Sequence, residues 1–157
     1  MNVNLTEIRR RSISVAQYVS SLEQPFQSKF LERKQAYRLQ AEMVKEIGKS
    51  ANDYVIVAFS AGWCKDCITN IPALALIAES TGLEVRVFGG LKKDPLSHTS
   101  KWRIPPSPPE VIPFDVDKIP LITVFDLSGK EIGRIVESPR RWPTLEQELG
   151  EIIKSSR

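Results

Sequence analysis

Residues 52–90 read "NDYVIVAFSAGWCKDCITNIPALALIAESTGLEVRVFGG" and contain the only two cysteines in the chain, Cys64 and Cys67. Residues 54–59 are an unbroken run of apolar side chains, several of them β-branched, which predicts a strand buried on both faces of a sheet. The two cysteines follow this strand directly, in a Cys-x-x-Cys spacing. The same stretch therefore indicates the fold class and contains the candidate reactive residues.

A helix and a second strand follow the cysteines. Apolar side chains recur at three- and four-residue spacings from residue 68 to residue 78, and Gly82 provides a helix stop. Pro72 lies inside this pattern, where it removes one backbone donor and predicts a bend. Residues 83–88 then form a shorter strand-like run. A strand, a helix and a strand of this length predict one right-handed βαβ unit.

The C-terminal part of the chain predicts a hairpin and a last helix. Residues 121–127 and 131–137 are strand-like runs that flank a Ser-Gly turn. Thr144 and Gln147 have the spacing of a capping box, with apolar residues on one face of the helix that follows. We therefore expect two antiparallel strands and a helix after the βαβ unit.

Residues 92–118 form a proline-rich insertion between these two parts. Consecutive prolines fix φ and supply no backbone donors, which predicts an extended loop, with at most a helical turn or two at residues 94–103. The prolines of the insertion are Pro95, Pro105, Pro106, Pro108, Pro109 and Pro113.

The N-terminal part predicts helices. We expect residues 1–11 to be unstructured, residues 12–22 to form a short helix, and one longer helical pattern to run from Pro25 to Gly48. Its apolar stripe requires a partner surface, on the domain itself or on a second copy in a homodimer. The expected organisation is an N-terminal helical extension at residues 1–50 and one domain at residues 51–157.

The composition is that of a globular chain. Of its 157 residues, 41% are hydrophobic and 26% are charged, and the net charge of +3 is too small to argue for nucleic acid as a partner. No apolar stretch approaches the roughly 18 residues of a membrane span, and no secretory signal is visible, so we expect a cytoplasmic protein. In a reducing compartment, a Cys-x-x-Cys pair points to catalysis or metal binding.

The two cysteines differ in their expected environments. Cys64 would lie at the start of the predicted helix, beside unpaired backbone N–H groups and next to the Lys65 cation, so its thiolate is favoured. Cys67 would lie one turn deeper. This asymmetry predicts that Cys64 attacks a disulfide and that Cys67 resolves the mixed disulfide that forms.

Two alternatives compete with a reactive dithiol. A closed zinc site needs four ligands, and the remaining candidate is the single His98 in the insertion, so no metal is expected. Two inert core cysteines are the other alternative, but a Cys-x-x-Cys between a buried strand and a helix favours a redox site.

Several motifs together resemble the thioredoxin superfamily over residues 53–153. They are "VAFSAGWCKDC" with Trp63 directly before the first cysteine, Pro72 five residues after the second, "KIPLITVF" at residues 118–125, and Gly133 in the hairpin. The resemblance implies an α/β thioredoxin-like fold, with a central four-stranded mixed sheet flanked by helices.

The resemblance also implies a site. Pro120 would be cis and would face the cysteines, lining a groove where an extended substrate segment pairs with the backbone. Cys64 would be the exposed nucleophile and Cys67 its resolving partner. The residues expected to bind substrate or support the cysteines are Trp63, Lys65, Asp66, Ile119 and Pro120.

The sequence departs from typical thioredoxins inside the motif and in the strand before it. Lys65 and Asp66 replace the Gly-Pro pair that helps to set the reduction potential in the family. Ala58 stands where thioredoxins carry a buried aspartate that takes the proton of the resolving cysteine. We therefore expect resolution by Cys67 to be slow near neutral pH and to rise with pH.

These observations predict a thiol–disulfide oxidoreductase that acts on protein or small-molecule disulfides. It would need no bound cofactor, but an upstream reductase would have to recharge its dithiol; neither nucleic acid nor a membrane is expected as a partner. The alternative is a redox-responsive protein-binding module, in which the state of the cysteines changes partner affinity with little turnover.

Overall fold

The computed structural model describes residues 1–97 and 101–157 and is built around one mixed sheet. The strand order is β1-β3-β2-β4-β5, which places β2 at the centre. β3 runs parallel to β2, whereas β4 runs antiparallel to both β2 and β5. The bounds are β1 Ile13–Ser14, β2 Tyr54–Phe59, β3 Glu84–Phe88, β4 Leu121–Asp126 and β5 Glu131–Val136.

The predicted βαβ unit and hairpin are confirmed. Every residue of β2 is buried, as its unbroken apolar run indicates. Helix α5 (Lys65–Thr81) connects β2 to β3 and ends at Gly82, whose φ of 79° lies in the left-handed region that glycine tolerates. Helix α6 (Leu145–Ser155) has Thr144 as its N-cap, which forms the predicted capping box with Gln147.

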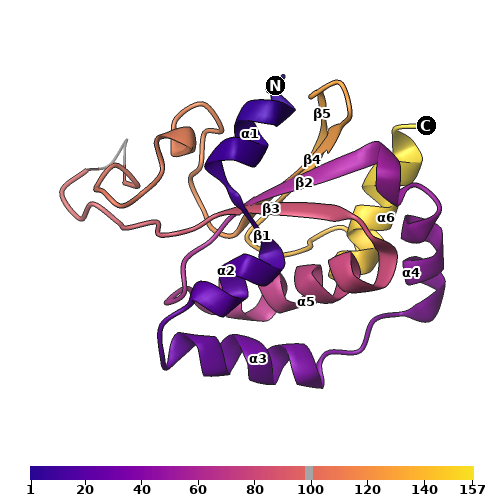
Figure 1. Cartoon of the computed structure of the whole chain (residues 1–157), viewed down its shortest axis with the longest axis horizontal. Helices are drawn as coiled ribbons and strands as arrows, with labels where there is room; N and C mark the ends of the chain where they lie inside the picture. Colours follow the sequence, from indigo (N-terminus) through magenta and orange to yellow (C-terminus); the bar gives the residue numbers. More distant parts are fainter. Residues whose placement is uncertain (98–100) are drawn as a thin grey trace.

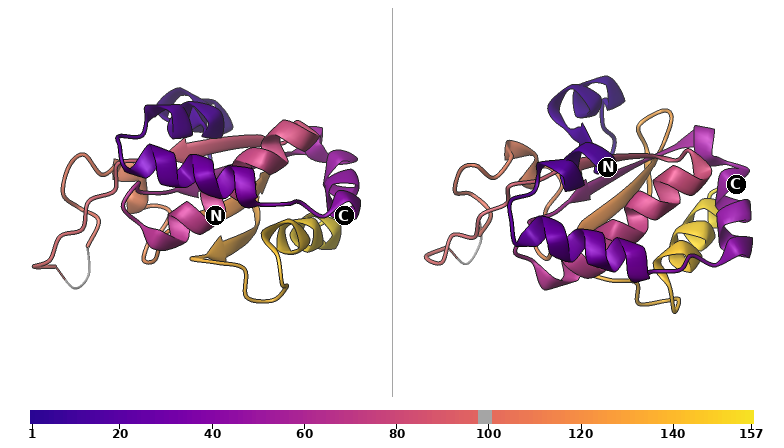
Figure 2. Two further views of the ribbon diagram at one scale, coloured as in Figure 1. Left: turned by 90° about the horizontal axis from the view of Figure 1, so that it is seen from below. Right: turned by 60° about the horizontal axis from the view of Figure 1, so that its bottom comes forward.

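The helices α2 (Val15–Ser21), α3 (Phe26–Ala36) and α5 lie together on one side of the sheet (Figures 1 and 2). α5 also packs against α4 (Ala41–Gly48) and α6. Buried side chains from the first 50 residues, among them Val15, Tyr18 and Phe30, belong to the same hydrophobic core as the sheet. The N-terminal helices therefore contribute directly to the core beneath the cysteines.

Our expectation that residues 1–11 lack structure is wrong, and the sheet has five strands instead of the expected four. Helix α1 (Leu5–Arg11) is capped by Asn4, whose side chain accepts a hydrogen bond from the Glu7 amide at 3.1 Å. After it, β1 pairs antiparallel with β3 and adds a fifth strand. The predicted short helix at residues 12–22 begins only at residue 15, as α2.

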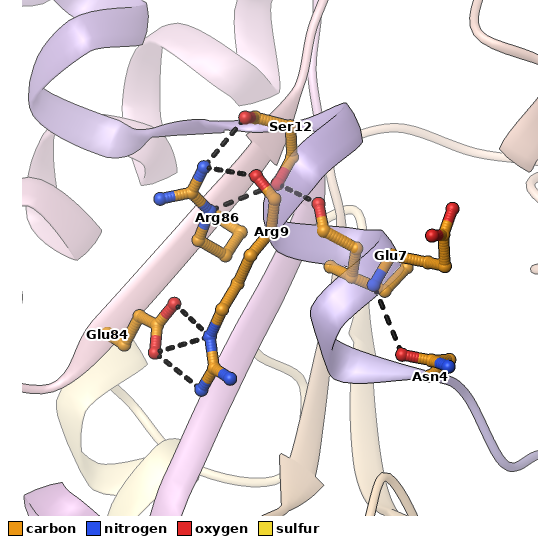
Figure 3. A network of polar contacts seen from close by, with 7 residues as sticks. Asn4, Glu7, Arg9, Ser12, Glu84 and Arg86 are labelled. Carbon is orange, nitrogen blue, oxygen red and sulfur yellow. Dashed lines mark hydrogen bonds and ion pairs between the residues drawn. The ribbon is translucent and has the colours of Figure 1, made fainter.

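A polar network joins α1 and its C-cap residue, Ser12, to β3 (Figure 3). The Arg9 guanidinium donates to both carboxylate oxygens of Glu84, each at 2.9 Å. Two residues later on β3, Arg86 donates to the carbonyl of Arg9 at 3.0 Å and to that of Ser12 at 2.6 Å. These partners lie more than 70 residues apart in the sequence, so no local pattern predicts them.

The single longer helix expected up to Gly48 is two helices, α3 and α4. The chain is extended between them, and a carboxylate from α6 satisfies polar groups at this break: Glu146 accepts from the Tyr37 hydroxyl at 2.6 Å and from the Gln40 amide at 3.0 Å. Glu146 is completely buried, so this link lies inside the structure rather than on its surface. Hydrophobic periodicity alone does not reveal such a distant partner.

The proline-rich insertion extends away from the sheet (Figure 1). In its described part, the helical segment is one short 3-10 turn, η2 (Pro109–Val111). In residues 94–97 the Ser97 amide donates to the Asp94 carbonyl at 3.3 Å, which closes a single turn without forming a helix. Phe114 returns to the core, where its ring packs within 4.9 Å of Phe59 and 5.9 Å of Phe125 between centroids. The insertion is thus anchored beside the end of β2.

No helix in residues 1–97 or 101–157 has both the length and the apolar character that a bilayer crossing needs.

Candidate active site

Cys64 is the N-cap residue of α5, as the sequence predicts. Its sulfur accepts a hydrogen bond from the Cys67 amide at 3.3 Å, so one of the unpaired donors of the first helical turn points at it. Both cysteines are free thiols. The local order of strand, turn and helix therefore places a nucleophilic sulfur at the positive end of a helix.

Cys64 is less exposed than the sequence indicates. It is 8% exposed, whereas Cys67 is completely buried. The Cys64 thiol donates a hydrogen bond to the carbonyl of Ile119, just before β4, at 3.5 Å. The expected order of accessibility is retained, but the nucleophile lies in a recess rather than on an open surface.

Several opposing effects act on the Cys64 thiol, and together they lower its pKa to about 7. The hydrogen bond from the Cys67 side chain is the largest of them. The backbone amides of Cys67 and Asp66 also lower the pKa, whereas burial and the Asp66 charge raise it. Lys65 is exposed on the first turn of α5, beside the half-buried Asp66. A pKa near 7 keeps a large fraction of Cys64 as thiolate under physiological conditions.

The pKa of the Cys67 thiol is shifted in the opposite direction, upward. Burial is the main cause that raises its pKa far above the ordinary range, and the hydrogen bond with Cys64 raises it further. A side-chain hydrogen bond from Ser60 acts in the other direction. Ala58 is completely buried in β2, so the position of the family aspartate offers no carboxylate. Burial therefore favours the protonated form of the Cys67 thiol.

The remaining predicted residues lie next to the pair. The Ile119–Pro120 peptide is cis, as the resemblance implies, and both residues are buried. The Pro120 carbonyl accepts a hydrogen bond from the Glu137 amide at 2.8 Å. Trp63 is 50% exposed, and its indole N–H donates to the Leu91 carbonyl at 3.3 Å. The structure therefore leaves half of a large aromatic side chain exposed beside Cys64.

Sequence reasoning missed Trp102, which the insertion places against Trp63. The two rings stack with centroids 6.1 Å apart and an interplanar angle of 30°. Trp102 is buried, and its indole N–H donates to the Asp117 carbonyl at 2.8 Å. A tryptophan within an otherwise proline-rich loop was the available signal, because a large aromatic residue in such a loop needs a packing partner.

A groove of about 550 Å³ begins beside Trp63. Its walls come from α2 and α3, from the turn before Cys64, and from the insertion. Leu22 and Phe26 approach the turn so closely that a Cβ on Gly62 would lie 3.2 Å from each of them. The other lining residues are Tyr18, Ser21, Glu23, Ala61, Trp63, Gly90, Leu91, Lys92 and Pro106.

Within the described residues, no group of three or more His, Cys, Asp or Glu side chains is placed to hold a metal ion. His98, the candidate fourth ligand in the sequence, lies outside those residues.

The pH dependence of alkylation tests the environment of Cys64. Iodoacetamide reacts with thiolates, so the rate at Cys64 should rise with pH and reach half its maximum near pH 7. Asp66→Asn removes a charge that raises this pKa and should shift the midpoint down. Cys67→Ala removes the largest cause that lowers it and should shift the midpoint up. Peptide mass spectrometry measures the rates.

Glu79→Gln is the matched control for this experiment. Glu79 lies on the same helix and pairs with Lys34, at the end distant from the cysteines. Its removal should leave the midpoint unchanged. Equal midpoints in all of these variants would contradict the causes assigned to the lowered pKa of Cys64.

The sequence of this chain also matches a known family. A sequence profile described as thioredoxin matches residues 12–95, more than half of the chain. The chain belongs to the thioredoxin family. The match extends from β1 through the cysteine pair and β3 to the start of the insertion. No curated protein sequence matches the chain significantly.

Two solved structures share the fold across nearly the whole length of this family member. A protein of unknown function from Pseudomonas aeruginosa has a TM-score of 0.75 at 17% identity, with 99% of each chain covered. An HIV epitope scaffold has a TM-score of 0.74 at 16% identity, with 99% of this chain and 100% of the scaffold covered. At this identity the likeness concerns the fold, N-terminal helices and insertion included.

Proposed function

We propose that this thioredoxin-family protein is a thiol–disulfide oxidoreductase acting on protein or small-molecule disulfides in the cytoplasm. The observation that carries the proposal is the asymmetry of the dithiol. The Cys64 sulfur caps α5 and accepts the Cys67 amide, whereas Cys67 is completely buried behind it. One sulfur is thus activated for attack, and the other is reachable only from within the protein.

The proposed reaction has two exchange steps. The Cys64 thiolate attacks one sulfur of the client disulfide, and the other client sulfur leaves as a thiolate that takes up a proton. The Cys67 thiolate then attacks the Cys64 sulfur and displaces the first client sulfur. The client gains two electrons and two protons, and Cys64 and Cys67 form a disulfide. An upstream reductase returns two electrons and two protons to the pair.

The surroundings of Cys64 favour a substrate that carries an apolar side chain next to its disulfide. Trp63 is half exposed, and the groove beside it is walled by Leu22, Phe26 and Leu91. Burial of one apolar side chain there contributes about 1.5–3 kcal/mol to binding. Pro106 and Lys92 of the insertion line the same groove. We therefore assign client selection to the insertion and the N-terminal helices together.

A second candidate function is a redox-responsive binding module. The specific observation in its favour is the strongly raised pKa of Cys67, which opposes rapid turnover. Trp63, the residue before Cys64, also stacks on Trp102 of the insertion. This contact would couple oxidation or reduction of the cysteines to the position of the insertion. In this case the oxidised and reduced forms would differ in affinity for a partner rather than in catalysis.

Turnover measurements distinguish the two functions. Reduction of a disulfide-bonded unfolded protein and of oxidised glutathione is followed with dithiothreitol as the electron source. An oxidoreductase should accelerate at least one of them beyond the rate with dithiothreitol alone, and Cys64→Ser should abolish the acceleration. No acceleration of either substrate would reject the catalytic proposal and favour the binding module.

A further inference from the structure

A buried amide on α5 connects the cysteine motif to the end of β5. Asn70 lies on α5 and is only 4% exposed. Its side-chain nitrogen donates to the carbonyl of Asp66 at 2.9 Å and to the carbonyl of Glu137 at 3.1 Å. Asp66 belongs to the first turn of α5, between the two cysteines, whereas Glu137 directly follows β5. One nitrogen atom therefore joins the cysteine motif to a residue that lies 67 positions after Asn70 in the chain.

Glu137 continues this connection to the segment that faces the Cys64 sulfur. Its amide donates to the carbonyl of Pro120 at 2.8 Å. Pro120 comes directly after Ile119, whose carbonyl is 3.5 Å from the Cys64 sulfur. The path from Asn70 through Glu137 thus ends one peptide group away from the contact of the sulfur. Asn70 therefore holds the helical turn that carries the sulfur and, through Glu137, the segment opposite it.

The backbone of Glu137 explains why a side-chain donor is needed at this place. Its φ of 72° lies in the left-handed region, which is unfavourable for residues that carry a Cβ and costs glycine little. Such a conformation persists only where the surrounding contacts impose it. Here the Asn70 amide binds the carbonyl of Glu137, and the Pro120 carbonyl binds its N–H. The carboxylate of Glu137 instead pairs with Arg140 near the surface, at 3.1 Å.

An asparagine is suited to this position because two carbonyls must be satisfied from one side chain. Carbonyls only accept, so the nitrogen of the amide, with its two hydrogens, must face both of them. A hydroxyl group has a single hydrogen. Thr69, the preceding residue, uses its hydroxyl for one bond within the helix, to the Lys65 carbonyl at 3.2 Å. The second hydrogen of Asn70 is the one that leaves the helix and reaches Glu137.

We propose that Asn70 is a positioning residue for disulfide exchange with polypeptide clients, acting through Glu137 on the segment opposite Cys64. The inference rests on the proposed function, in which the Cys64 thiolate attacks the client disulfide. An extended client segment would lie along the backbone at Ile119–Pro120 while its sulfur approaches Cys64. Such a client reacts fast only when the sulfur and this backbone are held in alignment, whereas a small disulfide requires the sulfur alone.

Two disulfides with the same leaving group separate these requirements. One is dithiobis(nitrobenzoate), and the other is a short unstructured peptide whose single cysteine is joined to thionitrobenzoate. In both cases the Cys64 thiolate bonds to one sulfur, and thionitrobenzoate, the better leaving group of the peptide reagent, departs with the electron pair of the broken S–S bond. Stopped-flow absorbance near neutral pH gives the rate of the first release with each reagent. We compare the ratio of the peptide rate to the small-disulfide rate between variants.

Asn70→Ser and Asn70→Ala both remove the link to Glu137. A serine at this position can still donate its single hydrogen to the Asp66 carbonyl, whereas alanine removes both bonds. We expect the peptide rate to fall about tenfold in both variants, because the client segment loses its alignment with the sulfur. The rate with dithiobis(nitrobenzoate) should stay within about twofold of the wild-type rate. A role in folding alone would change the two rates together.

Thr69→Val is the matched control. The Thr69 hydroxyl also donates to a carbonyl of the first turn of α5, that of Lys65. The variant removes this bond within the helix and leaves both bonds of Asn70 in place. It should change neither rate.

Rescue by glycine tests the path through Glu137. Glycine adopts a φ of 72° without the steric cost of a Cβ, so this segment needs the Asn70 bond less in Glu137→Gly. Asn70→Ala/Glu137→Gly should therefore react with the peptide within about threefold of the rate of Glu137→Gly alone. Asn70→Ala/Glu137→Ala also removes the pair with Arg140 but retains the cost of the Cβ, so its peptide rate should stay low.

An unchanged ratio of the two rates in either Asn70→Ser or Asn70→Ala would overturn the inference. A recovery that is no greater with Glu137→Gly than with Glu137→Ala would also overturn it, because the path depends on the backbone conformation of that residue. If Asn70→Ala does not fold, Asn70→Ser takes its place in both comparisons. The proposed function fails separately, when the wild-type protein releases thionitrobenzoate from both reagents but accelerates neither protein nor glutathione disulfide reduction.

Discussion

Cys64→Ser should eliminate turnover with disulfide substrates, whereas Cys67→Ser should retain the first exchange step and accumulate mixed disulfides on Cys64. The effect is complete because a hydroxyl in place of the capping sulfur is not ionised near neutral pH and cannot exchange. In Cys67→Ser the buried resolving thiol is absent, so the client stays bound. Mass spectrometry of non-reduced samples, with the client identified from the mass increase, measures the outcome.

The double variant Cys64→Ser/Cys67→Ser is the control for non-specific adducts and should trap nothing. Equal trapping by the two single variants would mean that the accessible sulfur has been misassigned. The capping geometry argues against this, because the Cys67 amide points at the Cys64 sulfur while the Cys67 sulfur is completely buried.

The elements nearest the cysteines are predictable from sequence because their signals are local. The run at β2 is apolar at every position, and a strand buried on both faces requires that pattern. The helix stop at Gly82 and the capping box at Thr144 are also properties of a few consecutive residues. Cys64 follows the central strand directly, so the amino-acid sequence alone indicates its position at the start of α5.

The N-terminal part is predicted less well because its partners are distant in sequence. Nothing in the local sequence indicates partners for Arg9 and Arg11, yet Arg9 pairs with Glu84 and Arg11 with Glu110. The break between α3 and α4 depends on Glu146, about a hundred residues later. Periodicity reports which residues face a core, but it does not report which distant polar group satisfies a backbone amide.

Distant partners also explain which residues of the candidate site the sequence does not reveal. Ser60 lies four residues before Cys64, and a polar residue at the end of a buried strand is a visible signal. Tyr18 carries no such signal, since the contact of its hydroxyl with the Ser60 Oγ at 2.9 Å depends on how α2 packs beside Gly89, after β3. Trp102 depends similarly on the path of the insertion. Side chains that reach a site from other elements require the tertiary structure.

Phe30→Ala should lower the free energy of unfolding by about 3–5 kcal/mol, because it removes a large aromatic side chain from a fully buried position and leaves a cavity. Phe30 lies on α3, and its ring meets the Tyr18 ring edge-on. For a domain with a typical stability of about 5–15 kcal/mol, this is a large fraction of the total. Urea denaturation followed by circular dichroism measures the change.

Leu31→Ala is the matched control, since Leu31 is the next residue of the same helix and is 42% exposed. It should change the stability by no more than about 0.5 kcal/mol.

The shape of the unfolding transition tests a second point. If α3 and α2 were an appendage, a cavity at Phe30 would melt them separately and leave the sheet intact. A single cooperative transition that moves as a whole would show that α2 and α3 unfold together with the sheet. Two separate transitions, or a loss below about 1 kcal/mol, would contradict the single shared core.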